Sequence, residues 1–409
     1  MRILYLHQYF VPPQAPGGPR SYEFARRLIA HGHQVCVISS PAFFPTNYQF
    51  TSLITQTEVA GTPMVIIRVP YSNSMSFAER IHAFLQFAFL ASWEAMRHPA
   101  DVVFATSTPL TIAIPAILAK LWQRIPLVFE VRDLWPELPI AVGALRNPVA
   151  KALAEALEWL AYHASVHVIA LSPGIAEGVM RRGMPATSIT VIPNACDVEL
   201  FDVPLSQGQV IRRRLPGLAE NQPLVVYTGT FGVINGVDYL VDVAVTMRTI
   251  ASDVRFLLVG SGAKKDMLIS KAQAGGVLNE NLWIWDPVPR TEMPNLLAAA
   301  TVATSLFVPL RPMWNNSANK FFDALAAGKP VAINYGGWQA ELLTDSGAGI
   351  VLPPNDPVLA AETLSSFVHD PQRLQQAAAA ARTLAYTRFH RDMLASKLEA
   401  SLCQAAERR

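Results

Sequence analysis

The residues with the clearest chemical potential lie between positions 315 and 337, where a polar turn, a short helix, a glycine and an apolar strand follow one another. Lys320 and Asp323 fall near the start of that predicted helix. Because amides at a helix N-terminus attract anions, an ammonium and a carboxylate beside them suit an anionic ligand that also carries hydroxyl groups. An ordinary connection between two parallel strands has the same pattern, so both interpretations stay open on these residues alone.

Local signals set the limits of this helix. Ser317 or Asn319 can cap its N-terminus, Gly328 is placed to end it, and Pro330 prevents its continuation.

The composition indicates a folded chain without general affinity for nucleic acid. Its 409 residues allow two or three domains, 51% are hydrophobic and 16% are charged, and a formal net charge of +2 offers little attraction for a phosphate backbone. Cys36, Cys196 and Cys403 are far apart, which predicts neither a disulfide framework nor a zinc cluster and favours the reducing cytoplasm. No Asp-x-Asp pair stands where a metal could be chelated, so we expect neither metal nor cofactor.

Short apolar runs alternate with helical segments, which indicates parallel sheets covered on both faces. In the first half we expect strands at residues 2–6, 34–39, 64–69, 101–105, 127–131, 166–170 and 189–192. We expect helices there at residues 20–30, 77–97, 110–123, 149–163 and 174–182. These elements predict a doubly wound domain over residues 1–203.

An irregular stretch near residues 204–223 resembles a linker, in which residues 209–215 could form a short helix. The alternation then resumes with strands at 224–228, 255–259, 282–285, 302–308 and 349–352, besides the one that follows Pro330. Helices are expected at 236–250, 263–274, 291–300, 357–369, 371–388 and 391–406. We predict a second doubly wound domain over 204–388, with residues 389–409 packing back on the first. If the halves face each other, the cleft between them is the predicted site.

The segment from Phe77 to Met96 comes nearest to a membrane span, but charged and polar residues interrupt it, so we expect no span. Aromatic residues are prominent on it, and Arg80 and Arg97 flank it. One interpretation places this helix in a membrane interface; the other buries it against the sheet.

Seven short pieces occur in a characteristic order and spacing, at residues 16–20, 130–137, 172–174, 192–194, 227–230, 259–262 and 315–337. Together they resemble the retaining glycosyltransferases of family 4. More narrowly, they resemble the bacterial branch that builds O-antigen and capsular polysaccharides, including transferases of the N-acetyl-fucosamine type. The resemblance covers almost the whole chain and implies the α/β GT-B architecture, with two doubly wound Rossmann-like domains facing a central cleft.

In the first half, the resemblance implies that Gly17 and Gly18 face the donor diphosphate, since a missing Cβ lets backbone amides approach an oxyanion. A tight turn is the alternative. Arg20, at the head of the next helix, could pair with phosphate or lie in solvent.

Arg132 matches a position where many members of the family have a histidine that contacts the donor sugar. Asp133 could orient Arg132 or accept a proton from the acceptor hydroxyl. A structural cluster of ion pairs over residues 130–137 is the alternative.

In the second half, Gly229 and Thr230 lie in the loop where the wider family clamps the diphosphate with Arg and Lys. Those charged positions read Thr230 and Asn235 here, so Lys320, with Arg311 behind it, is the compensating cation. The resemblance also implies donor binding at Gly260, Gly262, Val288, Asn316, Ser317 and Asn319. A tight strand-to-helix turn is the alternative at the two glycines.

The paired acids of the family fall on Asn315 and Asp323. Asp323 could accept hydrogen bonds from the ribose hydroxyls. Asn315 could bind the sugar but cannot act as a carboxylate nucleophile. The resemblance therefore implies front-face attack, with the departing diphosphate taking the acceptor proton.

We thus predict a retaining, metal-independent transfer of a sugar from a nucleotide-sugar donor to a lipid-linked saccharide in cell-surface polysaccharide or lipopolysaccharide biosynthesis. A UDP-N-acetylated sugar is the favoured donor. The chain would lie in the cytoplasm, peripherally on the inner face of the membrane through residues 77–96. The alternatives are a nucleotide-sugar 2-epimerase and a non-catalytic nucleotide-sugar-binding partner of another transferase.

Overall fold

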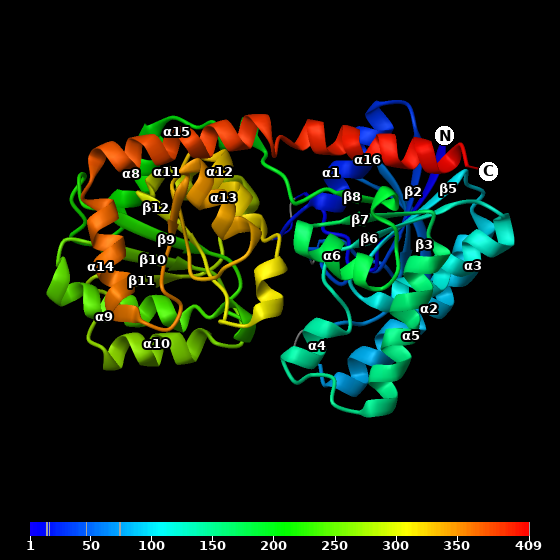
Figure 1. Ribbon diagram of the computed structural model, residues 1–409, viewed down its shortest axis with the longest axis horizontal. Coiled ribbons are helices and arrows are strands. Elements are labelled where there is room, and N and C mark those ends of the chain that lie inside the picture. The colour runs from blue at the N-terminus through cyan, green and yellow to red at the C-terminus, as the bar shows by residue number, and fades with distance from the viewer. Residues whose placement is uncertain (14, 16, 46, 73–74, 409) are drawn as a thin grey trace. The chain divides into compact units, whose positions relative to one another are not determined.

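The structure is a computed structural model that describes residues 1–409 except 14, 16, 46, 73–74 and 409 (Figure 1). The chain divides into two compact units. The first holds Met1–Pro193, Asn315–Ser317 and Asp392–Arg409, and the second holds Asn194–Trp314 and Ala318–Arg391. The change of unit after Pro193 lies before the boundary predicted at residue 203.

The sheet of the first unit has the strand order β3-β4-β2-β1-β5-β6-β7-β8 and is parallel except for the β3–β4 pair. Its strands are β1 (Arg2–Leu6), β2 (Gln34–Ser39), β3 (Ile54–Val59), β4 (Thr62–Ile67), β5 (Val102–Thr106), β6 (Leu127–Val131), β7 (His167–Ala170) and β8 (Ile189–Val191). The strand order reverses between β1 and β5, as in doubly wound sheets.

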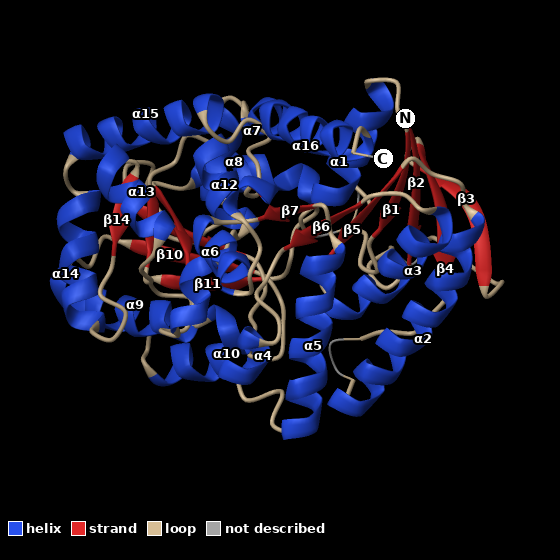
Figure 2. Cartoon of the chain, turned by 45° about the vertical axis from the view of Figure 1, so that its right-hand side comes forward, coloured by secondary structure: helices blue, strands red, loops and turns tan. Residues whose placement is uncertain are grey.

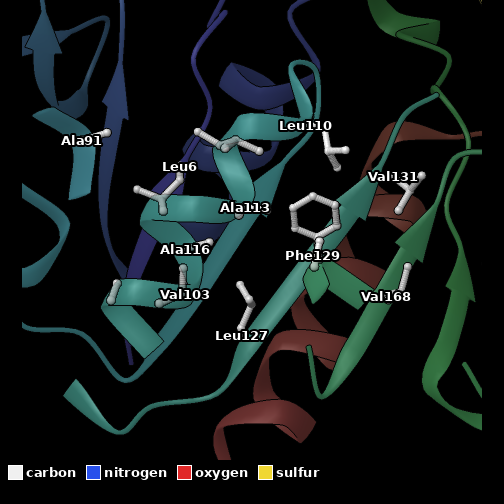
Figure 3. Packing of buried hydrophobic residues seen from close by; sticks show 14 of the residues in the cluster. Leu6, Ala91, Val103, Leu110, Ala113, Ala116, Leu127, Phe129, Val131 and Val168 are labelled. Carbon is white, nitrogen blue, oxygen red and sulfur yellow. The ribbon is translucent and has the colours of Figure 1, made fainter. Parts of the chain in front are cut away.

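The helices of the first unit are α1 (Arg20–Ala30), α2 (Phe77–Arg97), α3 (Ala113–Gln123), α4 (Glu137–Ala141), α5 (Pro148–Ala164), α6 (Pro173–Arg181) and α16 (Arg391–Ala406). Helices α2, α3 and α5 lie side by side (Figures 1 and 2). Figure 3 shows Leu6, Val103 and Phe129 of the strands gathered in one core with Ala113 and Ala116 of α3.

Helix α2 contains the segment from Phe77 to Met96, for which two interpretations were open. Ala83, Phe87, Ala91 and Ala95 on one of its faces are buried in the core beside the sheet. Its opposite face exposes large apolar side chains to solvent. The helix therefore packs on the sheet, as one of the two interpretations predicted, without becoming buried all round.

Helix α16 belongs to the first unit from Asp392 onward. Nε of Arg27 donates to Oδ1 of Asp392 at 2.6 Å. The ring nitrogens of His31 and His33 lie 2.7 and 2.8 Å from the Glu399 carboxylate. These polar contacts connect the last helix with the region around α1.

The sheet of the second unit is parallel, with the order β11-β10-β9-β12-β13-β14. Its strands are β9 (Leu224–Thr228), β10 (Arg255–Val259), β11 (Leu282–Trp285), β12 (Val302–Ser305), β13 (Val331–Ile333) and β14 (Gly349–Val351). Its helices are α7 (Val198–Phe201), α8 (Leu205–Arg213), α9 (Asp238–Ile250), α10 (Lys265–Ala274), α11 (Met293–Ala299), α12 (Asn319–Ala326), α13 (Trp338–Ser346), α14 (Pro357–Val368) and α15 (Pro371–Thr387).

Several local elements were not predicted, namely strand β3 and helices α4, α7 and α13. The short helix that residues 209–215 could form is present as α8, which begins four residues earlier. Neither Ser317 nor Asn319 caps α12, because the N-cap is Ala318, which has no side-chain acceptor. Gly328 follows the C-cap of that helix with a φ of +62°, as the glycine stop predicts.

Candidate functional site

Lys320 lies in the first turn of α12 and directs its ammonium toward the end of strand β9. Its Nζ donates to the Tyr227 hydroxyl at 2.8 Å and lies 4.3 Å from the centre of the Tyr227 ring and 5.8 Å from that of Phe307. Among the described residues, no carboxylate forms an ion pair with this ammonium. Burial lowers the pKa of Lys320 to about 7, because the charged form loses hydration.

This ammonium lies where an open α/β sheet binds ligands. Tyr227 belongs to β9 and Phe307 follows β12, and the strand order of the second sheet reverses between these two strands. Crevices at the carboxyl ends of strands beside such a reversal are the usual ligand sites of doubly wound folds. An uncompensated cation at this position suits an anionic ligand.

Gly229 shapes the loop next to the ammonium. It has a φ of +133°, which favours glycine, and a Cβ at this position would lie 3.3 Å from both Cε and Nζ of Lys320. The carbonyl of Thr230 accepts a hydrogen bond from the Tyr227 hydroxyl at 2.9 Å, and Thr230 itself is exposed. The loop thus holds Tyr227 while leaving room for the lysine.

Gly260 and Gly262 support that loop from behind. A Cβ on Gly260 would lie 1.8 Å from the carbonyl oxygen of Gly229, and one on Gly262 would lie 2.6 Å from the carbonyl oxygen of Phe231. The backbone N–H of Phe231 also donates to Ser261 at 2.8 Å. The geometry gives both glycines a packing role, as the tight-turn alternative predicted.

Asp323 lies one turn after Lys320 on the same helix but has a partner. Its two carboxylate oxygens accept from Nη1 and Nη2 of Arg290 at 2.6 and 2.8 Å. Arg290 also reaches Asp197 at 3.3 Å, and Asp197 in turn accepts from Arg391. The predicted ribose acceptor is therefore part of a largely buried four-residue ion network.

The segment Asn315–Ser317 groups with the first unit. The Ser172 hydroxyl donates to the backbone carbonyl of Asn315 at 2.7 Å. A Cβ on Gly174 would lie 2.0 Å from Oδ1 of Asn315, so the amide side chain fits against the start of α6 only because residue 174 is glycine. Asn316 is half-buried and Ser317 is buried.

Two other predicted donor residues belong to the second unit. Val288 lies in the loop after β11, and Asn319 begins α12; both are half-buried. Arg311, which was expected behind Lys320, has its guanidinium 4.5 Å from the ring centre of Trp314.

Arg20 is buried in the first unit, with only 1% of its surface exposed. Its guanidinium donates to Oε1 of Glu130 at 2.9 and 3.1 Å and to the carbonyls of Ile192 and Pro193 at 2.8 and 2.6 Å. The Thr106 hydroxyl donates to the other oxygen of Glu130. Arg20 therefore does not lie in solvent, and protein acceptors engage the group that was expected to face phosphate.

Arg132 and Asp133 follow β6 at the ligand edge of the first sheet, and both are half-buried. Nη1 of Arg132 lies 3.4 Å from Nε2 of His7, whose Nδ1 is 2.8 Å from the Ser21 hydroxyl. Burial, reinforced by the nearby Arg132 charge, lowers the pKa of His7 well below its ordinary value. Burial raises the pKa of Asp133, which Arg132 and Thr108 partly oppose.

Gly17 and Gly18 lie in the loop before α1. Gly17 has a φ of +126°, so a side chain there would strain the backbone, although Val11 at 3.6 Å leaves space for a Cβ. The loop is compatible with exposed amides and equally with a tight turn.

Sequence reasoning missed Tyr227, Arg290 and His7. Tyr227 could have been noticed, because it is the second-last residue of a buried strand and a buried tyrosine hydroxyl needs a hydrogen-bond partner. Arg290 had none, because its partners Asp323 and Asp197 are remote in sequence.

Among the described residues, no group of three His, Cys, Asp or Glu side chains is placed to hold a metal ion. No described helix is both long and apolar enough to cross a membrane.

Two family models match the chain in succession. A glycosyl transferase 4-like domain matches residues 17–195, and a glycosyl transferases group 1 domain matches residues 222–370. The chain is a glycosyltransferase of the GT-B fold. The two matches together span most of the sequence. The first contains the strands of the first sheet except β1, and the second contains the strands of the second sheet.

Curated relatives agree with this family at low identity. The D-inositol 3-phosphate glycosyltransferase of Xylanimonas cellulosilytica is 25% identical over 304 residues, covering 72% of this chain and 69% of that protein. The putative colanic acid biosynthesis glycosyl transferase WcaI of Escherichia coli K12 is 23% identical over 292 residues, covering 68% of this chain and 70% of its own length.

Solved structures share the fold of this glycosyltransferase. HepE of Anabaena, in complex with UDP and glucose, has a TM-score of 0.71 at 19% identity, covering 99% of this chain and 100% of its own. WaaG, a glycosyltransferase involved in lipopolysaccharide biosynthesis, has a TM-score of 0.72 at 17% identity, covering 98% and 99% of the two chains.

Proposed function

We propose that this glycosyltransferase takes its sugar from a UDP-linked donor and binds the donor diphosphate with the ammonium of Lys320 and the main-chain amide of Thr230. The observation that supports this proposal is the half-buried Lys320, whose ammonium has no acidic partner among the described residues. A diphosphate would supply the missing negative charge. In the reaction, the same cation would stabilise the charge that develops on the leaving group.

Arg290 would act as a positioning residue for Asp323. Each carboxylate oxygen of Asp323 accepts one hydrogen bond from Arg290 and keeps another lone pair. Asp323 can therefore still accept from a ribose hydroxyl, in an orientation that Arg290 fixes. Arg132, Asp133 and Asn315 remain our candidates for contact with the transferred sugar and the acceptor.

Asn315 supports a specific mechanism. An amide cannot form the covalent glycosyl intermediate that a carboxylate nucleophile forms. We propose retention by front-face attack without a metal, in which the leaving diphosphate oxygen takes the proton of the attacking hydroxyl. Proton NMR of the fresh product tests retention: we expect the donor's anomeric configuration, and the opposite configuration would contradict the proposal.

We further propose an N-acetylated sugar as the donor group and a lipid-linked saccharide as the acceptor, in cell-surface polysaccharide biosynthesis. The order of the sequence pieces supports this, as does similarity to WcaI, the putative colanic acid biosynthesis transferase. The chain would work at the inner face of the cytoplasmic membrane, with the exposed side of α2 toward the lipid.

A thermal-shift panel of UDP-sugars tests the donor proposal with the full chain. A ligand at 100 times its Kd adds about 2.7 kcal/mol to the free energy of unfolding. We expect one or more UDP-sugars to raise the Tm of the wild-type chain and to lose that effect in Lys320→Met. Equal stabilisation of both proteins would contradict the role of Lys320. Epimerised donor in the absence of any acceptor would instead identify a 2-epimerase.

A further inference from the structure

The outward face of α2 carries a stripe of large apolar side chains. Leu85, Phe89 and Trp93 follow one another at intervals of four residues and are 52%, 77% and 57% exposed. Residues spaced by four lie on one side of a helix, so they form a continuous apolar stripe. Arg97 ends the stripe, with its guanidinium 5.8 Å from the ring centre of Trp93.

The two neighbouring helices extend this surface. On α3, Leu118 and Trp122 are four residues apart, and Trp122 is 72% exposed. On α5, Val149, Leu153 and Leu160 repeat at intervals of four and seven residues and are all exposed. Since α3 contacts both α2 and α5, the three stripes lie on one layer of the first unit (Figures 1 and 2).

The three tryptophans of this layer lie toward the same end of its helices. Helices α2, α3 and α5 each connect parallel strands of one sheet, so they run in the same direction. Trp93, Trp122 and Trp159 all lie in the C-terminal halves of their helices. Within the part of the chain that the structure describes, every exposed tryptophan is one of these three.

Positive charge accompanies the apolar stripes. Within the described residues of the three helices and their flanks, six Lys and Arg residues and only two acids are not buried. The basic residues are Arg80, Arg97, Lys120, Arg124, Arg146 and Lys151, and the acids are Glu79 and Glu155. The whole chain has a formal net charge of only +2, so cations are concentrated on this layer.

We propose that the outward faces of α2, α3 and α5, here called the three-helix face, bind the surface of an anionic lipid bilayer. Tryptophan and basic side chains suit the level of the lipid headgroups, where an aromatic ring is partly buried and a cation meets phosphate. Leu85, Phe89 and Leu153 would enter the acyl boundary. A second copy of the chain fits this face less well, because a two-fold interface would oppose two positively charged surfaces.

The footprint is wider than the segment from Phe77 to Met96, since α3 and α5 contribute half or more of its exposed apolar side chains. Lipid binding itself does not depend on the donor site. Its use in catalysis rests on the proposed function, because a lipid-linked acceptor would be presented at the same bilayer.

Co-sedimentation of the full chain with vesicles of phosphatidylcholine, with and without phosphatidylglycerol, tests the proposal. We expect binding to the anionic vesicles, weakening as salt is raised, with a blue shift of tryptophan fluorescence. Leu121, beside Trp122 on α3, is 65% exposed. The double substitution Leu121→Gln and Trp122→Gln should weaken binding by about tenfold or more, because it removes two large apolar side chains from the contact. Leu205→Gln is the matched control, since Leu205 is 73% exposed in the second unit.

Donor binding is measured on the same proteins by the UDP-sugar thermal shift. UDP-sugars should raise the Tm of both variants as much as that of the wild-type chain. The donor proposal and the lipid proposal can therefore fail independently of each other. Equal vesicle binding by the double variant and the wild-type chain would overturn the proposal that the three-helix face binds lipid. So would equal binding to neutral and anionic vesicles, or a dimer that the double substitution dissociates.

Discussion

Arg20 in the first unit and Lys320 in the second occupy similar places and have opposite surroundings. Each is a cation in the first turn of a helix that follows a loop at the ligand edge of a parallel sheet. Arg20 donates to the Glu130 carboxylate and to two backbone carbonyls. The Lys320 ammonium has one hydroxyl and two aromatic rings around it.

The difference separates a structural cation from one that awaits a ligand. A buried charge is expensive unless it is paired, so the fold of the first unit pairs Arg20 internally. In the second unit the charge of Lys320 lacks that compensation, and its depressed pKa records the cost. The two cations therefore respond differently when their charge is removed.

Replacing Arg20 by Met should have the largest effect, which is a decrease in the free energy of unfolding. Removing one partner leaves the Glu130 carboxylate buried without its cation, which costs about 3–5 kcal/mol. Chemical denaturation of the purified variant, or its loss from the soluble fraction, measures this. A variant that unfolds at the wild-type denaturant concentration would show that the pair is not needed.

Replacing Lys320 by Met should have the opposite pattern. We expect turnover to fall by on the order of 10²-fold, because the leaving diphosphate loses its cation. The free energy of unfolding of the ligand-free chain should rise by about 1 kcal/mol or more, since a desolvated amine is replaced by an apolar side chain of similar length. Steady-state kinetics and denaturation measure the two effects. A variant that is both less stable and fully active would show that Lys320, like Arg20, has a structural role.

Arg290 provides an intermediate case, a paired cation beside the proposed site. Arg290→Lys keeps the charge but loses the two-pronged contact with Asp323. If Arg290 only stabilises the fold, the KM for the donor should not change. If it orients Asp323, that KM should rise by about tenfold with a smaller change in kcat.

The pH dependence of donor binding gives the smallest effect. A bound diphosphate favours the charged ammonium, so affinity is full below the free pKa of about 7 and falls as pH rises through it. For a nucleotide sugar, whose diphosphate does not titrate in this range, we expect about a fivefold loss between pH 7 and pH 8. Isothermal calorimetry should also detect proton uptake. Lys320→Met serves as the control and should remove both signals.

The ligand-free chain has a stability trend of known sign from the same group. Between pH 7 and the ordinary lysine pKa of about 10.4, the unfolded chain holds a proton that the folded chain has lost. This group therefore makes the chain more stable as pH rises across that window. Lys320→Met should flatten that contribution.

The regular elements could be predicted from the sequence because they depend on local patterns. The predicted bounds of β1, β2, β6, α1 and α2 agree with the structure. Strand β3 was missed because its polar residues hide the alternation, although the two-residue turn at Ala60 and Gly61, with positive φ at both, is a hairpin signal.

The site was harder to predict because its pairing is not local. The sequence places Arg20 at a helix start but does not show that Glu130, 110 residues later, lies against it. The same holds for Asp323, whose partner Arg290 is 33 residues earlier. Lys320 could be proposed because the family resemblance calls for a cation at the diphosphate while its usual Arg and Lys positions read Thr230 and Asn235. The sequence does not show that Asp323, three residues later, pairs with Arg290 instead of Lys320.

Gly229 and Gly260, near Lys320, affect how donor preference can change. An atom added at Gly260 would push the carbonyl of Gly229, and an atom added at Gly229 would push the end of Lys320. The position of the Lys320 amine thus depends on the absence of a Cβ at Gly229, which lies next to it, and at Gly260, which lies behind Gly229. Substitution at a residue that never meets the sugar nucleotide could shift the amine by a fraction of an ångström, and so retune which nucleotide sugars the enzyme accepts.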